Sequence, residues 1–197
     1  MKRWWIVPAF LGMALVAGQP VLAQSSNDKD EDEDAPYNYA LGVGVGLVEA
    51  DQTENYFTAA LRLRVGRDGD DDQNGRRRDR GIEGYVEPEI GYWESSDDRI
   101  EGSDLLLGVN LIGAMPFSRA ESFIGVGVGA HFIDSQVLEA DPTLDDSETK
   151  IGVNAQFGID LRLSRSLSAF GTGRFDLVQG SAENVQTKVY LGLRARF

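Results

Sequence analysis

The sequence of 197 residues contains no cysteine and only one histidine. The absence of cysteine excludes a disulfide framework and any metal site with thiolate ligands. Basic residues are also scarce: 19 lysines and arginines stand against 32 aspartates and glutamates, and the formal net charge is −13. This acidic balance argues against nucleic-acid binding, because nucleic-acid phosphates select basic surfaces. The length predicts a single domain.

An apolar run long enough for a transmembrane helix is also missing. The longest run, Trp4 to Gly18, follows Lys2 and Arg3 and is about 15 residues long, short of the ~20 that a helix needs to cross a bilayer. The sequence "VLA" then precedes Gln24. A positive start, a short apolar core and a small-x-small site are typical of a secretory signal peptide, which we assign to residues 1–23. The exported chain is expected to be either soluble or a membrane β-barrel.

The next segment, residues 24–36, reads "QSSNDKDEDEDAP" and has no large hydrophobic side chain. A segment that is strongly acidic and poor in hydrophobic residues cannot form a core, so we expect a disordered spacer. Binding of cations or of a partner by this spacer is the alternative interpretation. The remaining residues, 37–197, then make up the folded domain.

Large apolar side chains alternate with small or polar ones throughout this domain. The pattern is clearest in "KIGVNAQFGIDLRL", residues 150–163. Alternation with a period of two predicts β-strands. Eight segments show it, with Leu106, Ile112 and Phe170 as exceptions and Gly171 and Gly173 as a predicted bulge; they are residues 37–48, 56–65, 82–93, 104–115, 123–132, 150–163, 167–177 and 185–197.

The second face of these strands combines glycine with charged residues of both signs. In a soluble β-sandwich, the alternative fold, this face would meet water and nothing would require so many glycines. In a membrane barrel the apolar face meets lipid and the glycines make room inside for long side chains. The sequence therefore predicts an all-β fold, an eight-stranded antiparallel transmembrane β-barrel over residues 37–197.

Charges inside such a barrel need partners, because an unpaired buried charge is strongly destabilising. We expect Arg62 and Arg64 to pair with Glu87 and Glu89 across neighbouring strands. The residues predicted to form interior ion pairs are Arg62, Arg64, Glu87, Glu89, Asp160, Arg162, Arg174, Asp176, Arg194 and Arg196. Lys150, Lys188, Glu83 and Asp104 are also predicted to face inward.

Connection lengths and aromatic residues suggest an orientation. The connections at 116–121 and 164–166 are short, as periplasmic turns are, and the insert at 66–81 is the exception on that side. Lipid-facing aromatic residues gather near both ends of the strands, as in the aromatic belts of membrane barrels. These residues are Phe57, Tyr92, Phe132 and Phe175 at the outer ends, and Tyr37, Tyr39 and Phe197 at the inner ends.

The segment "VYLGLRARF" resembles the C-terminal signature of bacterial outer-membrane proteins, with Val189, Leu191, Leu193 and Phe197 on the lipid side. Together with the signal peptide and the strands "LGVGVGL" and "FIGVGVGA", it makes residues 37–197 resemble the small OmpA/OmpX-type barrels. This resemblance implies a place in the outer membrane of a Gram-negative bacterium and insertion by the barrel assembly machinery. Such barrels include anchors, adhesins, lipid-modifying enzymes and narrow, porin-like channels.

Sequence motifs for cofactor binding or catalysis are weak. "GVGVGA" at 125–130 matches a dinucleotide pattern, but its alternation continues to Phe132, which indicates a strand rather than a strand–turn–helix. His131 lies near Ser135, yet some barrels of this type that deacylate lipid A have His and Ser two residues apart on the lipid side. Here the spacing is four and alternation turns His131 inward, so we expect a structural histidine.

No catalytic residue, cofactor site or dedicated metal site is therefore predicted. The segment 70–81 begins like a calcium loop but has Gly81 where the bidentate glutamate would stand. The expected role is structural or in surface interaction, with a lipid-modifying enzyme or a narrow channel as alternatives. Divalent cations could bridge lipopolysaccharide to acidic residues of the outer loops: Glu49, Asp51, Glu54, Asp97, Asp98, Glu101, Glu139, Asp141, Asp145, Asp146 and Glu148.

Overall fold

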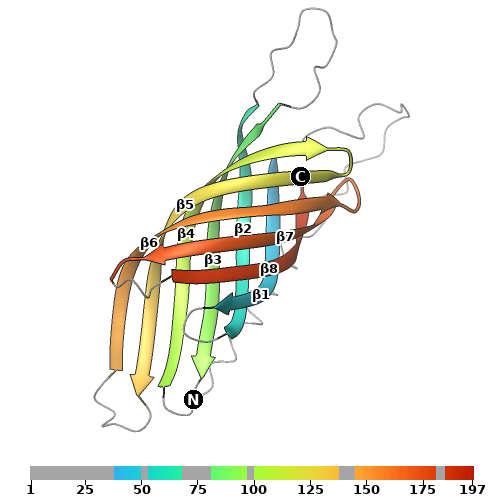
Figure 1. Cartoon of the computed structure of the whole chain (residues 1–197). Helices are drawn as coiled ribbons and strands as arrows, with labels where there is room; N and C mark the ends of the chain where they lie inside the picture. Colours follow the sequence, from blue (N-terminus) through green and yellow to red (C-terminus); the bar gives the residue numbers. More distant parts are fainter. Residues whose placement is uncertain (1–37, 50–52, 68–80, 97–99, 138–144, 181–184) are drawn as a thin grey trace, which may run out of the picture.

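The computed structural model describes residues 38–49, 53–67, 81–96, 100–137, 145–180 and 185–197. Eight antiparallel strands form a closed barrel in sequence order, in which β1 pairs with both β2 and β8 (Figure 1). The strands are β1 (Tyr39–Glu49), β2 (Thr53–Arg67), β3 (Glu83–Ser96), β4 (Ile100–Phe117), β5 (Ala120–Val137), β6 (Asp145–Arg162), β7 (Leu167–Val178) and β8 (Val185–Arg196). The predicted fold is confirmed, and the β-sandwich is excluded. The signal peptide, the spacer and the insert at 68–80 lie outside the described residues.

Polarity in the barrel wall is inverted relative to a water-soluble protein. Apolar side chains such as Ile124 and Leu191 are 69% and 67% exposed on the outside, whereas Arg62, Arg174 and Lys188 are fully buried inside. This distribution suits an exterior in hydrocarbon and an interior whose charges neutralise each other. Among the described residues, no helix is both long and apolar enough to span a membrane.

Three apolar side chains that interrupt the alternation fill the interior. Leu106, Ile112 and Phe170 are all buried. The ring of Phe170 packs edge-on against Tyr190, with ring centroids 6.2 Å apart. Phe170 thus belongs to the inner face of a regular strand.

The predicted bulge at Gly171 and Gly173 is wrong, because β7 pairs residue for residue with β6 and β8. A Cβ on Gly173 would lie 2.9 Å from the Phe157 ring, so the missing side chain makes room for Phe157 instead. The irregularity in register lies in β2, between Arg64 and Gly66.

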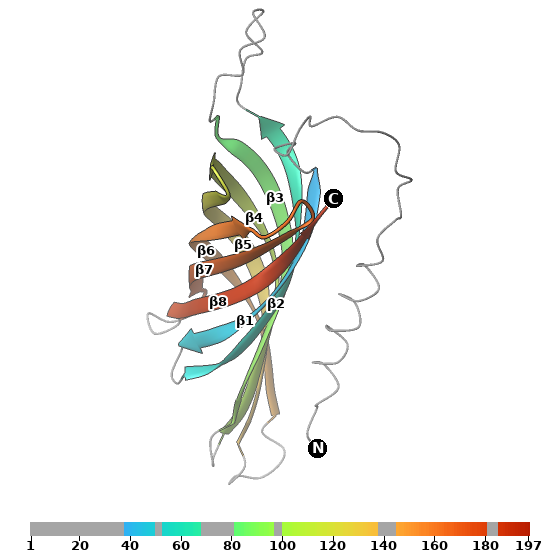
Figure 2. The same ribbon diagram turned by 90° about the vertical axis from the view of Figure 1, so that its right-hand side faces the viewer.

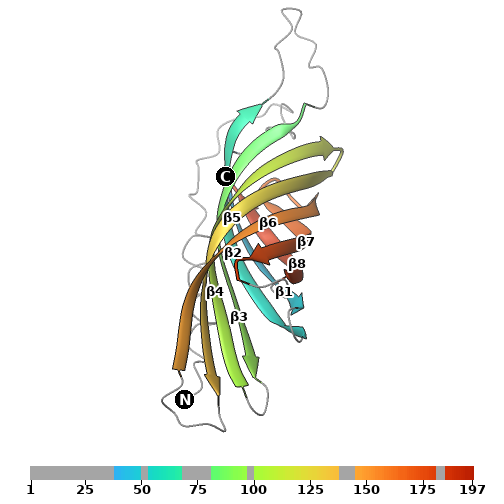
Figure 3. The same cartoon turned by 60° about the vertical axis from the view of Figure 1, so that its left-hand side comes forward.

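The wall is uneven in height. Strands β4, β5 and β6 have 18 residues each, against 11 in β1 and 12 in β7 and β8. The sequence predicted long loops after the third and fifth strands, but the ladder continues through pairs such as Ser103–Asp134 and Ser135–Asp146. Most residues of these extensions are polar, so the alternation disappears while the backbone pairing continues. Strands β3 to β6 therefore extend past the rest of the wall at one end, which we call the loop end (Figures 1 and 3).

The opposite end, called the turn end, carries the two short connections. Ser118 and Arg119 form the β4–β5 turn, with Ser118 at φ 54°, and residues 163–166 join β6 to β7. β8 pairs with β1 from Ala40–Arg196 at this end to Glu49–Thr187, which closes the barrel (Figure 2). The rings of Tyr39 and Phe197 stack at the turn end with centroids 5.5 Å apart, as an aromatic belt predicts.

Candidate functional site

Charged side chains fill the barrel in two clusters. The turn-end cluster consists of Arg62, Glu87, Glu121, Asp160, Arg194 and Arg196. The loop-end cluster consists of Glu89, Asp104, His131, Arg174, Asp176 and Lys188, and all twelve side chains are buried. The two clusters meet at β3, where Glu87 and Glu89 both point inward because they are two residues apart.

Arg62 organises one half of the turn-end cluster. Its Nε donates to Glu87 Oε2 at 2.7 Å, and its Nη1 donates to Glu121 Oε1 at 3.3 Å. The guanidinium carbon lies 4.7 Å from the centroid of the Phe123 ring and 5.5 Å from that of Tyr85. Two carboxylates and two aromatic rings therefore hold one guanidinium away from water, where charge-assisted hydrogen bonds are strong.

Asp160 organises the other half. It accepts hydrogen bonds from Arg194 and, at 2.7 Å, from Nη2 of Arg196. Arg194 also lies 3.5 Å from Glu87, which joins the two halves. Three carboxylates thus face three guanidinium groups, and the turn-end cluster has no net charge.

The loop-end cluster contains a second set of ion pairs. Arg174 binds Glu89, and its Nη2 donates to Asp176 Oδ1 at 2.7 Å. Lys188 Nζ lies 3.1 Å from the other oxygen of Asp176. Asn110 donates to the free oxygen of Glu89 at 2.6 Å.

Asp104 joins strands from opposite sides of the loop-end cluster. Its Oδ2 accepts hydrogen bonds from Trp93 Nε1 at 3.3 Å and from Gln186 Nε2 at 3.2 Å, and it lies 2.9 Å from His131 Nδ1. His131 faces inward as alternation predicted. Its Nε2 has no hydrogen-bond partner among the described residues, so the hydrogen bond to a hydroxyl that a nucleophile–base pair requires is not formed there.

The predicted pairing was partly correct. Arg62 pairs with Glu87, but Arg64 Nη2 donates to Glu83 at 3.2 Å instead of to Glu87 or Glu89. The carboxylate of Glu89 is taken by Arg174, which reaches it across the lumen. Alternation assigns a side chain to a face but carries no information on distances across a barrel.

Three further charged residues can be compared with the sequence prediction. Glu121 was missed because the sequence assigned it to a turn, although the alternation of β5 continued backwards would have placed it inside. Arg162 is half-buried at the turn end of β6. Lys150 Nζ lies 2.8 Å from Glu148 at the loop end, where Glu148 is exposed.

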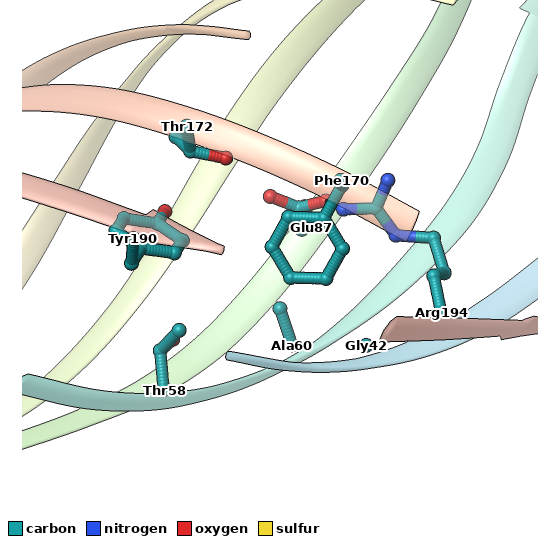
Figure 4. A pocket seen from close by; sticks show the side chains of 8 residues that line it. All are labelled: Gly42, Thr58, Ala60, Glu87, Phe170, Thr172, Tyr190 and Arg194. Carbon is teal, nitrogen blue, oxygen red and sulfur yellow. The ribbon is translucent and has the colours of Figure 1, made fainter. Parts of the chain in front are cut away.

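A small cavity lies beside the turn-end cluster, where Glu87 and Arg194 line it (Figure 4). The volume open to the centre of a water molecule is about 10 Å³, so the cavity holds at most about one water. Its lining residues are Gly42, Thr58, Ala60, Glu87, Phe170, Thr172, Tyr190 and Arg194. Within the described part of the chain, no group of three or more His, Asp or Glu residues could hold a metal ion.

Known structures share this architecture. Neisserial surface protein A superposes with a TM-score of 0.55 at 11% identity over 81% of this chain and 96% of that one. Ail, the attachment invasion locus protein of Yersinia pestis, gives 0.53 at 12% identity over 81% and 96%. The outer-membrane enzyme PagL gives 0.50 at 14% identity over 80% and 99%.

The chain has the fold of the small outer-membrane β-barrels. The resemblance to OmpA/OmpX-type barrels is thus confirmed for the fold. No protein-family model matches the sequence, and no curated protein matches it. At these identities the likeness shows the fold and no activity, and the three structures named here are of a surface protein, an attachment invasion locus protein and an enzyme.

Proposed function

We propose that this barrel lies in the outer membrane of a Gram-negative bacterium as a non-catalytic scaffold that presents its loop end at the cell surface. The observation that carries the proposal is a fully buried ion-pair interior inside a continuous apolar exterior. The exterior requires a bilayer, because its apolar side chains are exposed around the whole barrel. The interior stabilises the wall, and the tall strands β3 to β6 carry surface beyond it.

Two features favour this role over a narrow channel. Arg62 in the turn-end cluster and Arg174 in the loop-end cluster are each bound by two carboxylates. An ion on its way through would have to displace these pairs in a region of low dielectric constant, which costs several kcal/mol. The cavity beside the turn-end cluster has room for about one water molecule and is lined by bulky rings such as Phe170 and Tyr190.

The arrangement around His131 favours the same role over a lipid-modifying enzyme. A hydrolase needs a base that is hydrogen-bonded to a nucleophile and open to its substrate. His131 is fully buried and faces Asp104 inside the barrel, away from the lipid-facing surface.

The partners that fit this proposal are lipopolysaccharide around the loop end and the barrel assembly machinery during insertion. Val189, Leu191, Leu193 and Phe197 are all exposed on the outside of β8 and just beyond it, where a recognition signal for assembly would be accessible. Exposed carboxylates of Glu49, Glu94, Asp134 and Glu148 surround the loop end. These carboxylates would repel anionic lipopolysaccharide unless divalent cations bridge the two.

Membrane fractionation, gel mobility and conductance test the proposal together. We expect the protein in the outer-membrane fraction, a mobility in detergent that changes after boiling, and no steady conductance in planar bilayers. A soluble protein with one mobility would contradict the membrane location. Large, steady conductance would contradict the closed scaffold, and release of fatty acid from lipopolysaccharide would contradict the non-catalytic role.

A further inference from the structure

The turn end carries two arginines that no carboxylate of the described residues neutralises. Arg119 in the β4–β5 turn and Arg165 in the β6–β7 connection are both exposed. Neither has an ion-pair partner among the described residues, whereas Arg62, Arg64, Arg174, Arg194 and Arg196 all do. An exposed arginine next to a membrane is available to a phosphate group, whose geometry its guanidinium matches.

The β4–β5 turn lies beside the end of β6, where the β6–β7 connection begins (Figures 1 and 3). The backbone N–H of Arg162, the last residue of β6, donates to the carbonyl oxygen of Arg119 at 2.8 Å, and the N–H of Arg196 in β8 donates to the carbonyl oxygen of Ser166 in the β6–β7 connection at 2.9 Å. The arginines are thus carried on one rigid rim of the barrel. The nearby carboxylates of Glu121 and Asp160 are buried and already bound to interior arginines, so they do not neutralise this rim.

The position of the rim indicates which phosphate it would meet. Phe117, Leu161 and Leu163 next to the turns are exposed on the outside of the barrel, so they lie in the apolar band. Arg119 and Arg165 follow directly after this band, at the level where lipid headgroups replace hydrocarbon. Arginine stems can extend along the apolar surface while the charged group remains at the interface.

Charge distinguishes the two ends of the molecule. The exposed charged side chains of the loop end are acidic, as at Glu49, Glu94, Asp134 and Glu148. Within the described part of the turn end, no Asp or Glu is exposed. Among the described residues, the exposed arginines that would attract a headgroup with a net negative charge therefore lie at the turn end.

We propose that Arg119 and Arg165 form a binding site for the phosphate of an anionic phospholipid in the leaflet at the turn end. In the orientation proposed above, this is the periplasmic leaflet of the outer membrane, so the inference rests on that membrane location. Each basic residue near an anionic surface contributes about 1 kcal/mol, so two together predict a preference for anionic lipid of roughly thirtyfold.

Spin-labelled lipids around the full-length protein in vesicles test this site. We expect labelled phosphatidylglycerol to be held at the protein perimeter roughly thirtyfold more strongly than labelled phosphatidylcholine. Arg119→Gln/Arg165→Gln should lose most of this preference, Arg119→Lys/Arg165→Lys should keep most of it, and added salt should weaken it. Lys150→Gln, which removes a cation at the loop end, is the matched control and should leave the preference unchanged.

Equal preference in the wild-type protein and the double glutamine variant would overturn the proposal. Full competition by soluble inorganic phosphate would also overturn it, because it would show a site for free anions rather than for a lipid. Gel mobility before and after boiling is measured on the same samples. A wild-type protein that does not insert would refute the membrane location, and the lipid site with it, whereas an inserted barrel without lipid preference would refute the lipid site alone.

Discussion

The ring of Phe197 stacks on the ring of Tyr39, and the backbone N–H of Phe197 donates to the carbonyl oxygen of Tyr39 at 2.9 Å. These two residues are 158 positions apart in the numbering and belong to the two strands whose pairing closes the barrel. One pair of residues thus contributes both to the aromatic belt and to the pairing of β1 with β8.

Phe197→Ala should lower the free energy of unfolding by more than the removal of a similarly exposed aromatic ring elsewhere on the barrel does. Phe132→Ala is the control, because Phe132 is 41% exposed and Phe197 is 46% exposed, and no ring contact of Phe132 is recorded among the described residues. The stacking contributes about 0.5–1.5 kcal/mol beyond burial. Denaturant titration of the refolded protein in lipid measures the difference, and equal losses for both variants would contradict it.

Glu87→Ala should be among the most destabilising single changes in the wall. It leaves Arg62 and Arg194 without a shared carboxylate in a buried site, which costs about 3–5 kcal/mol. Glu148→Ala, which removes an exposed carboxylate that pairs with Lys150, should cost less than about 1 kcal/mol. Midpoints of denaturant unfolding at unchanged slope provide the comparison. Similar midpoints for the two variants would show that the interior pair is not buried as described.

Gly192→Ala should impair closure of the barrel. A Cβ at this position would overlap the carbonyl oxygen of Val43 on the neighbouring strand and lie 2.5 Å from Phe170 Cζ. Overpacking of a filled interior costs about 1–3 kcal/mol, and a backbone atom cannot move aside as a side chain can. Gly113→Ala is the control, since the nearest atom to its Cβ would be 3.6 Å away. The yield of heat-modifiable barrel after refolding should fall for Gly192→Ala only.

Calcium should protect the loop end in bilayers that contain lipopolysaccharide. Asp134 and Glu148 are exposed on adjacent strands, where Ile133 pairs with Glu148 and Asp134 pairs with Ser147. Cation bridges to lipid phosphates should slow amide exchange of this hairpin relative to the same sample with chelator. Asp134→Asn/Glu148→Gln should reduce the difference. Identical exchange with calcium and with chelator would exclude the cation bridge.

The sequence predicted the faces of the strands far better than their partners or their lengths. Each inward position of β6, from Gly152 to Asp160, was correct because the pleat alone determines it. The partner of Arg64 was wrong because the register of β2 against β3 places Tyr85 opposite Arg64 and Glu83 two residues away, and a period of two does not contain the register. The long ends of β4 to β6 were missed because alternation depends on one apolar face, and most residues of these ends are polar.

In the candidate sites, too, the sequence predicted which way a side chain faces but not which residue it contacts. His131 was placed inside correctly, but its approach to Asp104 on the neighbouring strand, two residues out of register, required coordinates. In the sequence, Arg119 and Arg165 belong to two separate short turns, and nothing in the sequence relates them to each other. Only the pairing of β5 with β6 brings Arg119 beside the β6–β7 connection.

The pairing of β1 with β8 has a kinetic consequence. In an open sheet, unfolding begins at an edge strand, which leaves by breaking one ladder. In this barrel β1 is bound from Tyr39 to Glu49 by β2 and from Ala40 to Glu49 by β8, so any strand that leaves must break two ladders at once. The barrier to opening is correspondingly high, and the lifetime of the native state is set by the rate of this first rupture rather than by the equilibrium free energy.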